Sequence, residues 1–133
     1  GKQRVRVMKR GNFAHSYTPE QTVSYENYIK ECYLKAREED ETARELWDKP
    51  LIMNITAIYT IPKSYSKKKT IDALAGKLRP LTKPDLDNIC KVVCDALNTI
   101  AYADDKQIVR LTTEKYYGER PMVIVELKIW HLN

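Results

Sequence analysis

The chain has 133 residues, which suits one small domain with a single hydrophobic core. It is 43% hydrophobic and 31% charged, and it has no run of about 18 apolar residues, so no membrane span is expected. The formal net charge is +5, and three cysteines without an apparent signal segment indicate reduced thiols in a cytoplasmic protein.

The positive charge is concentrated in two segments. Residues 2–10 carry five Lys or Arg and no acid, and residues 63–83 carry seven against one Asp. Such segregation is typical of a surface that binds nucleic-acid phosphates, although two solvated basic loops would give the same pattern. The cations that we expect to contact DNA are Arg4, Arg6, Lys9, Arg10, Lys67, Lys68, Lys69, Arg79 and Lys83.

The first half of the chain predicts a helix followed by a strand. Residues 1–17 are expected to be irregular or extended. A helix should begin after Thr18, which can act as its cap, with Pro19 at the first helical position and Gln21 completing a capping box. Residues 51–59 are rich in β-branched and apolar side chains, which predicts a strand buried at least partly on both faces. The helix should bury one stripe, made of Tyr25, Tyr28, Ile29, Cys32, Tyr33 and Ala36.

The second half predicts a long connection, a helix and two strands. Residues 60–83 form the connection, with a short helix at 71–78. After Pro84 the apolar residues follow the spacing i, i+3, i+4, i+7, i+8, i+11, which is close to an ideal amphipathic helix. Strands at 108–117 and 122–132 should form a hairpin around 118–121. We therefore expect one α/β domain over residues 1–133, with a mixed β-sheet packed against two main helices.

Aspartates precede and follow the second predicted helix. Asp85 and Asp87 lie at its start, and Asp104 and Asp105 follow its end. Crowded carboxylates repel one another unless a cation neutralises them. Oxygen ligands without a nearby His or Cys favour Mg²⁺ or Mn²⁺ over zinc. In a basic chain, this pattern predicts metal-assisted chemistry on nucleic acid.

The same residues also allow a simpler interpretation. Asp87, Lys91 and Asp95 are spaced i, i+4, i+8 and share one polar stripe of the helix, where Lys91 could form only a surface ion pair. Asp85 could be only an N-cap. Asp105 should lie near the other end of the helix, so it reaches Asp85 only if the fold or a dimer brings the two together.

Cys90 and Cys94 share one face of this helix, but no His or third Cys lies nearby in sequence. We interpret them as packed thiols rather than as a zinc site. His15 and His131 have no nucleophile partner, and the four glycines form no phosphate-binding pattern. The aspartates therefore remain the main candidates for chemistry.

Two stretches resemble the core motif of the RusA family, namely KPDLDNICKVVCDALN at residues 83–98 and DDKQIV at residues 104–109. Residues 2–7 and the segment Tyr17-Thr18-Pro19 are also similar to that family. Its members are small, homodimeric, Mg²⁺-dependent endonucleases that resolve Holliday junctions and are frequently carried by phages and prophages. The resemblance implies a RusA-like fold and the following roles: Asp85, Asp87 and Asp105 as metal ligands, Lys91 as catalytic lysine, and Asp104 as a further candidate ligand.

The resemblance implies a structure-selective endonuclease that uses Mg²⁺, with Mn²⁺ as a substitute, and acts on four-way junctions in DNA recombination and repair. We expect a homodimer in a bacterial or phage-infected cytoplasm, with no membrane partner and no small-molecule cofactor. The alternatives are a nuclease that cuts other branched DNA, such as flaps or forks, and a junction-binding protein without catalysis. The family usually has a strand before the segment matched by residues 2–4, so we expect that strand to be absent or cut away here. Val5 also stands where a proline is common.

Overall fold

The computed structural model describes the backbone of residues 4–10 and 19–132 and the side chains of residues 25–132. Its elements in chain order are strand β1 (Arg4–Arg10), helix α1 (Pro19–Glu38), 3₁₀ helix η1 (Ala43–Leu46), strand β2 (Leu51–Thr60), helix α2 (Lys67–Leu74), helix α3 (Leu86–Leu97), 3₁₀ helix η2 (Asp105–Gln107), strand β3 (Ile108–Gly118) and strand β4 (Met122–Ile129).

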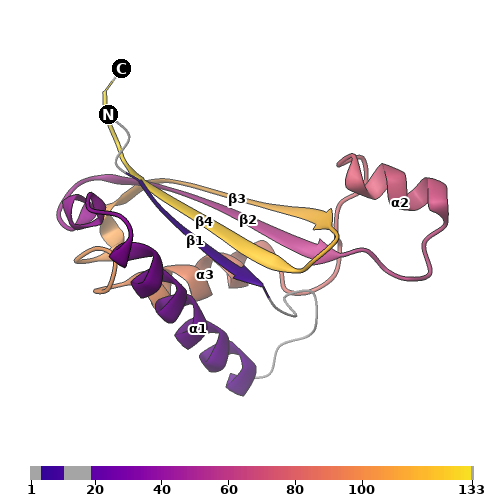
Figure 1. The fold of residues 1–133 in the computed structure, drawn as a ribbon, viewed down its shortest axis with the longest axis horizontal. Helices are drawn as coiled ribbons and strands as arrows, with labels where there is room; N and C mark the ends of the chain where they lie inside the picture. The colour runs from indigo at the N-terminus through magenta and orange to yellow at the C-terminus, as the bar shows by residue number, and fades with distance from the viewer. Residues whose placement is uncertain (1–3, 11–18, 133) are drawn as a thin grey trace.

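The four strands of the described residues form one mixed sheet in the order β1-β4-β2-β3. β2 pairs with β3 in parallel, whereas the β2–β4 and β4–β1 pairs are antiparallel. A parallel pair needs a crossover connection, and the segment containing α2 and α3 supplies it. Figure 1 shows α1 and α3 on the same side of the sheet, with α2 standing beyond the ends of β2 and β3. The predicted α/β class, mixed sheet and two main helices are confirmed.

The hydrophobic core fills the space between the sheet and the two main helices. From α1 it receives Ile29 and Tyr33, whereas Tyr28 of the predicted stripe is 42% exposed. None of the described helices is long and apolar enough to cross a membrane. The apolar face of α3 is buried as its spacing predicted, through Ile89, Val92, Val93, Ala96 and Leu97. Ile100, at the i+11 position of that spacing, instead lies beyond the end of α3 and is half-buried.

The predicted hairpin between the last two strands is wrong. β3 and β4 lie on opposite sides of β2 and do not pair with each other. The connection passes the end of β2, where Thr60 pairs with Gly118 and Ile58 pairs with Met122. A Cβ atom at Gly118 would lie 2.5 Å from Cγ2 of Ile58, so this close crossing requires a glycine.

Residues 4–10 form a regular strand paired with β4, in agreement with the extended alternative of the prediction. Another segment, α2, differs from expectation, because it begins at Lys67 rather than at residue 71. Ser66 caps it by accepting a hydrogen bond from the Lys69 backbone N–H at 3.1 Å. Past its end, Gly76 has a positive φ of 81°, which favours glycine. Because α2 begins at Lys67, residues Lys67, Lys68 and Lys69 form its first turn.

Candidate active site

Asp85 and Asp87 occupy the N-terminal end of α3. Oδ1 of Asp85 accepts a hydrogen bond from the Asn88 backbone N–H at 3.0 Å, so the N-cap interpretation of Asp85 is confirmed. This bond uses one of the two carboxylate oxygens, and both Asp85 and Asp87 are exposed. A carboxylate at this position can therefore cap the helix and still offer an oxygen to a cation.

The turn that leads into Asp85 is tied to two strands. The Tyr59 hydroxyl on β2 donates a hydrogen bond to the Pro84 carbonyl oxygen at 2.6 Å. On β3, Nζ of Lys115 donates to the Thr82 carbonyl oxygen at 2.8 Å, and it lies 5.1 Å from the centroid of the Tyr59 ring. The start of α3 is thus held on the sheet by side chains far away in sequence.

Lys115 also places a positive charge near the acidic turn. Burial lowers the pKa of Lys115, and the Asp85 carboxylate opposes that shift. Sequence reasoning missed this residue because a lysine in a strand usually points to solvent. Its position also depends on the pairing of β2 with β3, which the predicted hairpin did not include: Lys115 pairs with Ala57, which is buried between the buried residues Ile55 and Tyr59.

Lys91 lies on the exposed side of α3. Its Nζ is 3.6 Å from Oδ2 of Asp95, and the two side chains are 75% and 47% exposed. An ion pair of this kind stabilises a helix by about 0.3–0.5 kcal/mol. The ammonium group is therefore only weakly held, and its catalytic role stays a prediction.

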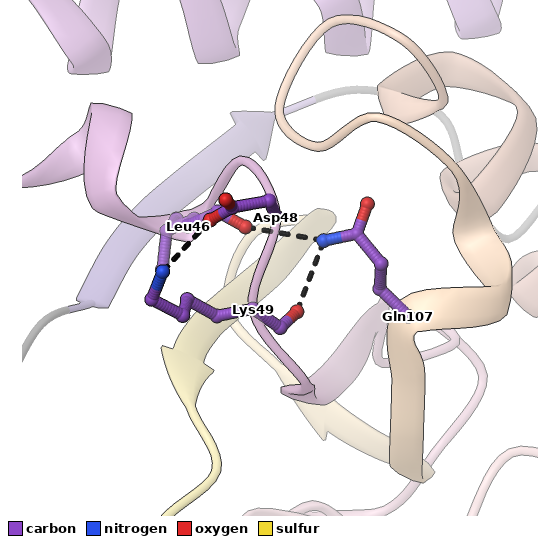
Figure 2. Close-up of polar contacts among 4 residues, drawn as sticks. All are labelled: Leu46, Asp48, Lys49 and Gln107. Atoms are coloured by element: carbon purple, nitrogen blue, oxygen red, sulfur yellow. Dashed lines mark hydrogen bonds and ion pairs between the residues drawn. The ribbon is translucent and has the colours of Figure 1, made fainter.

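The second acidic pair divides into two different environments. Asp104 caps η2, because Oδ1 accepts a hydrogen bond from the Lys106 backbone N–H and Gln107 completes a capping box. Figure 2 shows the Gln107 amide donating to the carbonyl oxygens of Leu46 and Lys49, at 3.3 and 3.0 Å. These bonds fasten η2 to the segment before β2, so Asp104 has a clear structural task.

Asp105 is exposed, and its backbone N–H donates to Oδ1 of Asn98 at 3.0 Å. Asn98 is the C-cap of α3, whereas Asp85 is the N-cap. The helix rises 1.5 Å per residue, so about 20 Å separates the two ends. Within one chain, the structure brings Asp85 and Asp87 to one end of α3 and leaves Asp105 at the other.

Across the described residues, no group of three or more acidic, His or Cys side chains is arranged to hold a metal ion. Two carboxylates nevertheless match what Mg²⁺ requires, because this ion keeps several waters and commonly uses only one or two protein carboxylates. The all-oxygen pair at Asp85 and Asp87 therefore fits a Mg²⁺ ion. A third ligand from Asp105 would have to come from elsewhere.

The cysteines of α3 pack on the core, in agreement with their interpretation as thiols. Sγ of Cys90 lies 2.8 Å from Oγ1 of Thr113 on β3. Burial raises the pKa of Cys94 to about 11, with smaller contributions from Cys90, Asp105 and Asp95. The Cys94 thiol is accordingly a poor nucleophile at neutral pH.

The predicted DNA-contacting cations fall into three groups. Lys67, Lys68 and Lys69 are exposed in the first turn of α2, and Lys83 is exposed in the connection between α2 and α3. Nζ of Lys69 lies 4.2 Å from the Tyr65 ring centroid. Cations at a helix N-terminus are unfavourable unless an anion is bound there. This turn is thus electrostatically suited to a phosphate.

Arg79 makes extensive contacts within the chain. Its Nη1 donates to the Lys115 carbonyl oxygen at 2.9 Å, and it lies over the Tyr116 ring and 3.7 Å from Glu114. It therefore fastens the connection to β3, and its DNA contact stays a prediction. The third group belongs to β1, whose side chains lie outside the described residues, namely Arg4, Arg6, Lys9 and Arg10.

The lysine-rich turn and the acidic turn lie at the same end of the sheet (Figure 1). The hydroxyl group of Tyr65, which lies just before α2, is 3.2 Å from the hydroxyl group of Tyr117. The two rings pack edge to face. Lys115, which binds the acidic turn, is two residues away on the same strand, or about 7 Å. These contacts connect the segment just before α2 with the strand that carries Lys115.

Comparison with known proteins is consistent with this geometry. A protein of Bacillus subtilis (strain 168), named uncharacterized protein YqaN, is 47% identical over 81 residues, which cover 59% of this chain and 57% of that protein. The chain thus spans little more than half the length of this relative. The family model described as endodeoxyribonuclease RusA matches residues 1–128, which is nearly the whole chain. The chain belongs to the RusA endodeoxyribonuclease family.

Proposed function

We propose that this protein is a metal-dependent endonuclease that resolves four-way DNA junctions as a homodimer, in DNA recombination and repair in a bacterial cytoplasm. The observation that carries the proposal is the pairing of an acidic turn with a lysine-rich helix start at one end of the sheet. The first offers carboxylates to a cation, and the second offers charge to a phosphate backbone. Family membership supports the nuclease activity.

In this proposal, Asp85 and Asp87 hold Mg²⁺, with Mn²⁺ as a substitute. The bound ion would supply charge neutralisation at the scissile phosphate and a more acidic water molecule. Asp85 keeps its place through its bond to the Asn88 N–H, and Asp87 projects from the first turn beside it. Lys91, one turn further along α3, would stabilise the negative charge that develops on the phosphate, after exchanging its weak pairing with Asp95.

The third carboxylate, Asp105, is proposed to come from a second copy of the chain. If two copies place their α3 helices antiparallel across a two-fold axis, the N-terminal end of each helix meets the C-terminal end of the other. Two equivalent sites would result, each with Asp85 and Asp87 from one copy and Asp105 from its mate. Two such sites suit paired cuts in a four-way junction.

The proposal can be tested with three synthetic substrates of equal length: a four-way junction, a flap and a linear duplex, each with and without Mg²⁺. We expect Mg²⁺-dependent cleavage of the junction and little of the duplex. Asp87→Asn should still bind the junction without cutting it, because it loses a ligand and an anionic charge. Preferred cleavage of the flap would identify a nuclease for other branched DNA, and binding without cleavage by the wild type would identify a non-catalytic junction binder.

A further inference from the structure

We propose that Lys115 is a positioning residue of the acidic site, which fixes the turn carrying Asp85 so that its carboxylate is presented to the metal ion. This inference rests on the proposed function. No sequence motif indicates the residue, since it lies on β3, 30 positions after Asp85. Its role follows from the contacts that join this strand to the turn.

Lys115 is fastened to the connection between β2 and α3 at two points. Its ammonium group donates to the Thr82 carbonyl oxygen at 2.8 Å, three residues before Asp85. Its own carbonyl oxygen accepts a hydrogen bond from Nη1 of Arg79 at 2.9 Å. The first contact holds the turn in place. The second restrains the backbone of Lys115 itself, so the residue that holds the turn is also fixed.

A second anchor acts on the same turn from the neighbouring strand. The buried Tyr59 hydroxyl donates to the Pro84 carbonyl oxygen at 2.6 Å, and the Tyr59 ring lies beneath the Lys115 ammonium group. Thr82 and Pro84 are therefore both held by their carbonyl oxygens. Asp85 follows immediately and enters α3 as its cap, so the direction of its carboxylate depends on this turn.

The alternative is that Lys115 is only a nearby cation. A positive charge close to a metal site repels the metal ion, so its removal should then strengthen metal binding. A positioning role predicts the opposite sign, because a carboxylate with a loosened backbone binds less well. Loss of a residue that orients a ligand typically weakens metal binding at least about 10-fold. The sign of the change therefore separates the two roles.

The test is isothermal titration of the wild-type chain and of Lys115→Met with Mn²⁺, without DNA. Met keeps the unbranched stem over the Tyr59 ring and removes only the ammonium group. We expect the dissociation constant to rise about 10-fold, with a matching rise in the Mg²⁺ concentration that half-saturates junction cleavage. Lys128→Met on β4 is the matched control, because it also removes one half-buried lysine of the sheet and should keep wild-type affinity.

Two more variants keep the test decisive if Lys115→Met folds poorly. Lys115→Arg should recover part of the affinity, since a guanidinium can still donate to Thr82 but with a different shape. Tyr59→Phe should also weaken Mn²⁺ binding, because it removes the bond to Pro84 and keeps the ring. Unchanged or tighter Mn²⁺ binding in Lys115→Met or Tyr59→Phe would overturn the positioning role alone. A wild-type chain that neither binds Mn²⁺ nor cuts the junction would overturn the proposed function with it.

Discussion

Two inactive variants should restore each other's activity if each metal site is shared between two copies of the chain. Asp85 and Asn98 cap the two ends of α3, and Asp105 is bonded to Asn98. The 1.5 Å rise per residue places these ends about 20 Å apart. Ligands of one Mg²⁺ ion must all lie about 2.1 Å from it, so a single chain in this conformation does not supply all three.

The perturbation is a mixture of Asp85→Asn and Asp105→Asn chains. Each homodimer would lack one ligand at both sites. A heterodimer would have one site that lacks two ligands and one site that is intact. Random pairing makes about half of the dimers heterodimers, so about one quarter of the wild-type number of sites should be active. If each site were built within one chain, no site in the mixture would be intact.

The assay is single-turnover nicking of one labelled strand in a synthetic four-way junction, because one intact site cuts one strand. The two chains should be refolded or expressed together, with different affinity tags, and the heterodimer purified through both tags. Recovery of nicking supports the shared site. A doubly tagged heterodimer that remains as inactive as each homodimer would refute the reasoning from the length of α3.

Other predictions follow from single contacts. Neutralising Lys67–Lys69 together should weaken junction binding and lower its log–log salt slope by up to about three, measured by gel shift at several salt concentrations. Lys91→Ala should cost no more than about 0.5 kcal/mol of stability but slow single-turnover cleavage about 10² to 10³-fold. A wild-type cleavage rate in this variant would mean that Lys91 forms only a surface ion pair. Gly118→Ala should destabilise the fold by about 1–3 kcal/mol in urea unfolding, because its Cβ would clash with Ile58. Because burial raises the pKa of Cys94 to about 11, its alkylation at pH 8.5 should be much slower than that of a free thiol.

The two main helices, α1 and α3, were predictable because their signals are local. The spacing from Ile89 onward describes the buried face of α3 without reference to any other element. The strand order was not predictable in the same way. Gly118 and Pro121 suit either a hairpin or a crossing past the end of β2. The choice depends on whether β2 lies between β3 and β4, which these residues do not indicate. α2 was misplaced because the Ser66 cap lies in front of lysines that suggested a loop.

Sequence could select candidate site residues, whose roles stay predictions. Asp85, Asp87 and Asp105 could be selected from their spacing and from the family motif, and the structure supports the first two as neighbours on one helix end. The residues that hold the acidic turn could not be found in this way. Tyr59 and Lys115 contact it only because β2 and β3 pair in parallel, with residue 57 opposite residue 115.

The sheet order also has a consequence for how the chain reaches its native state. β1 pairs only with β4 among the described strands, so its hydrogen bonds join residues 4–10 to residues 122–128. These contacts span almost the entire sequence, and such long-range pairings slow folding. On the ribosome, β1 must wait unpaired until β4 has been synthesised. Early folding should therefore rest on α3 and on the pairing of β2 with β3, and a chaperone that shields β1 during that interval should raise the yield of native protein.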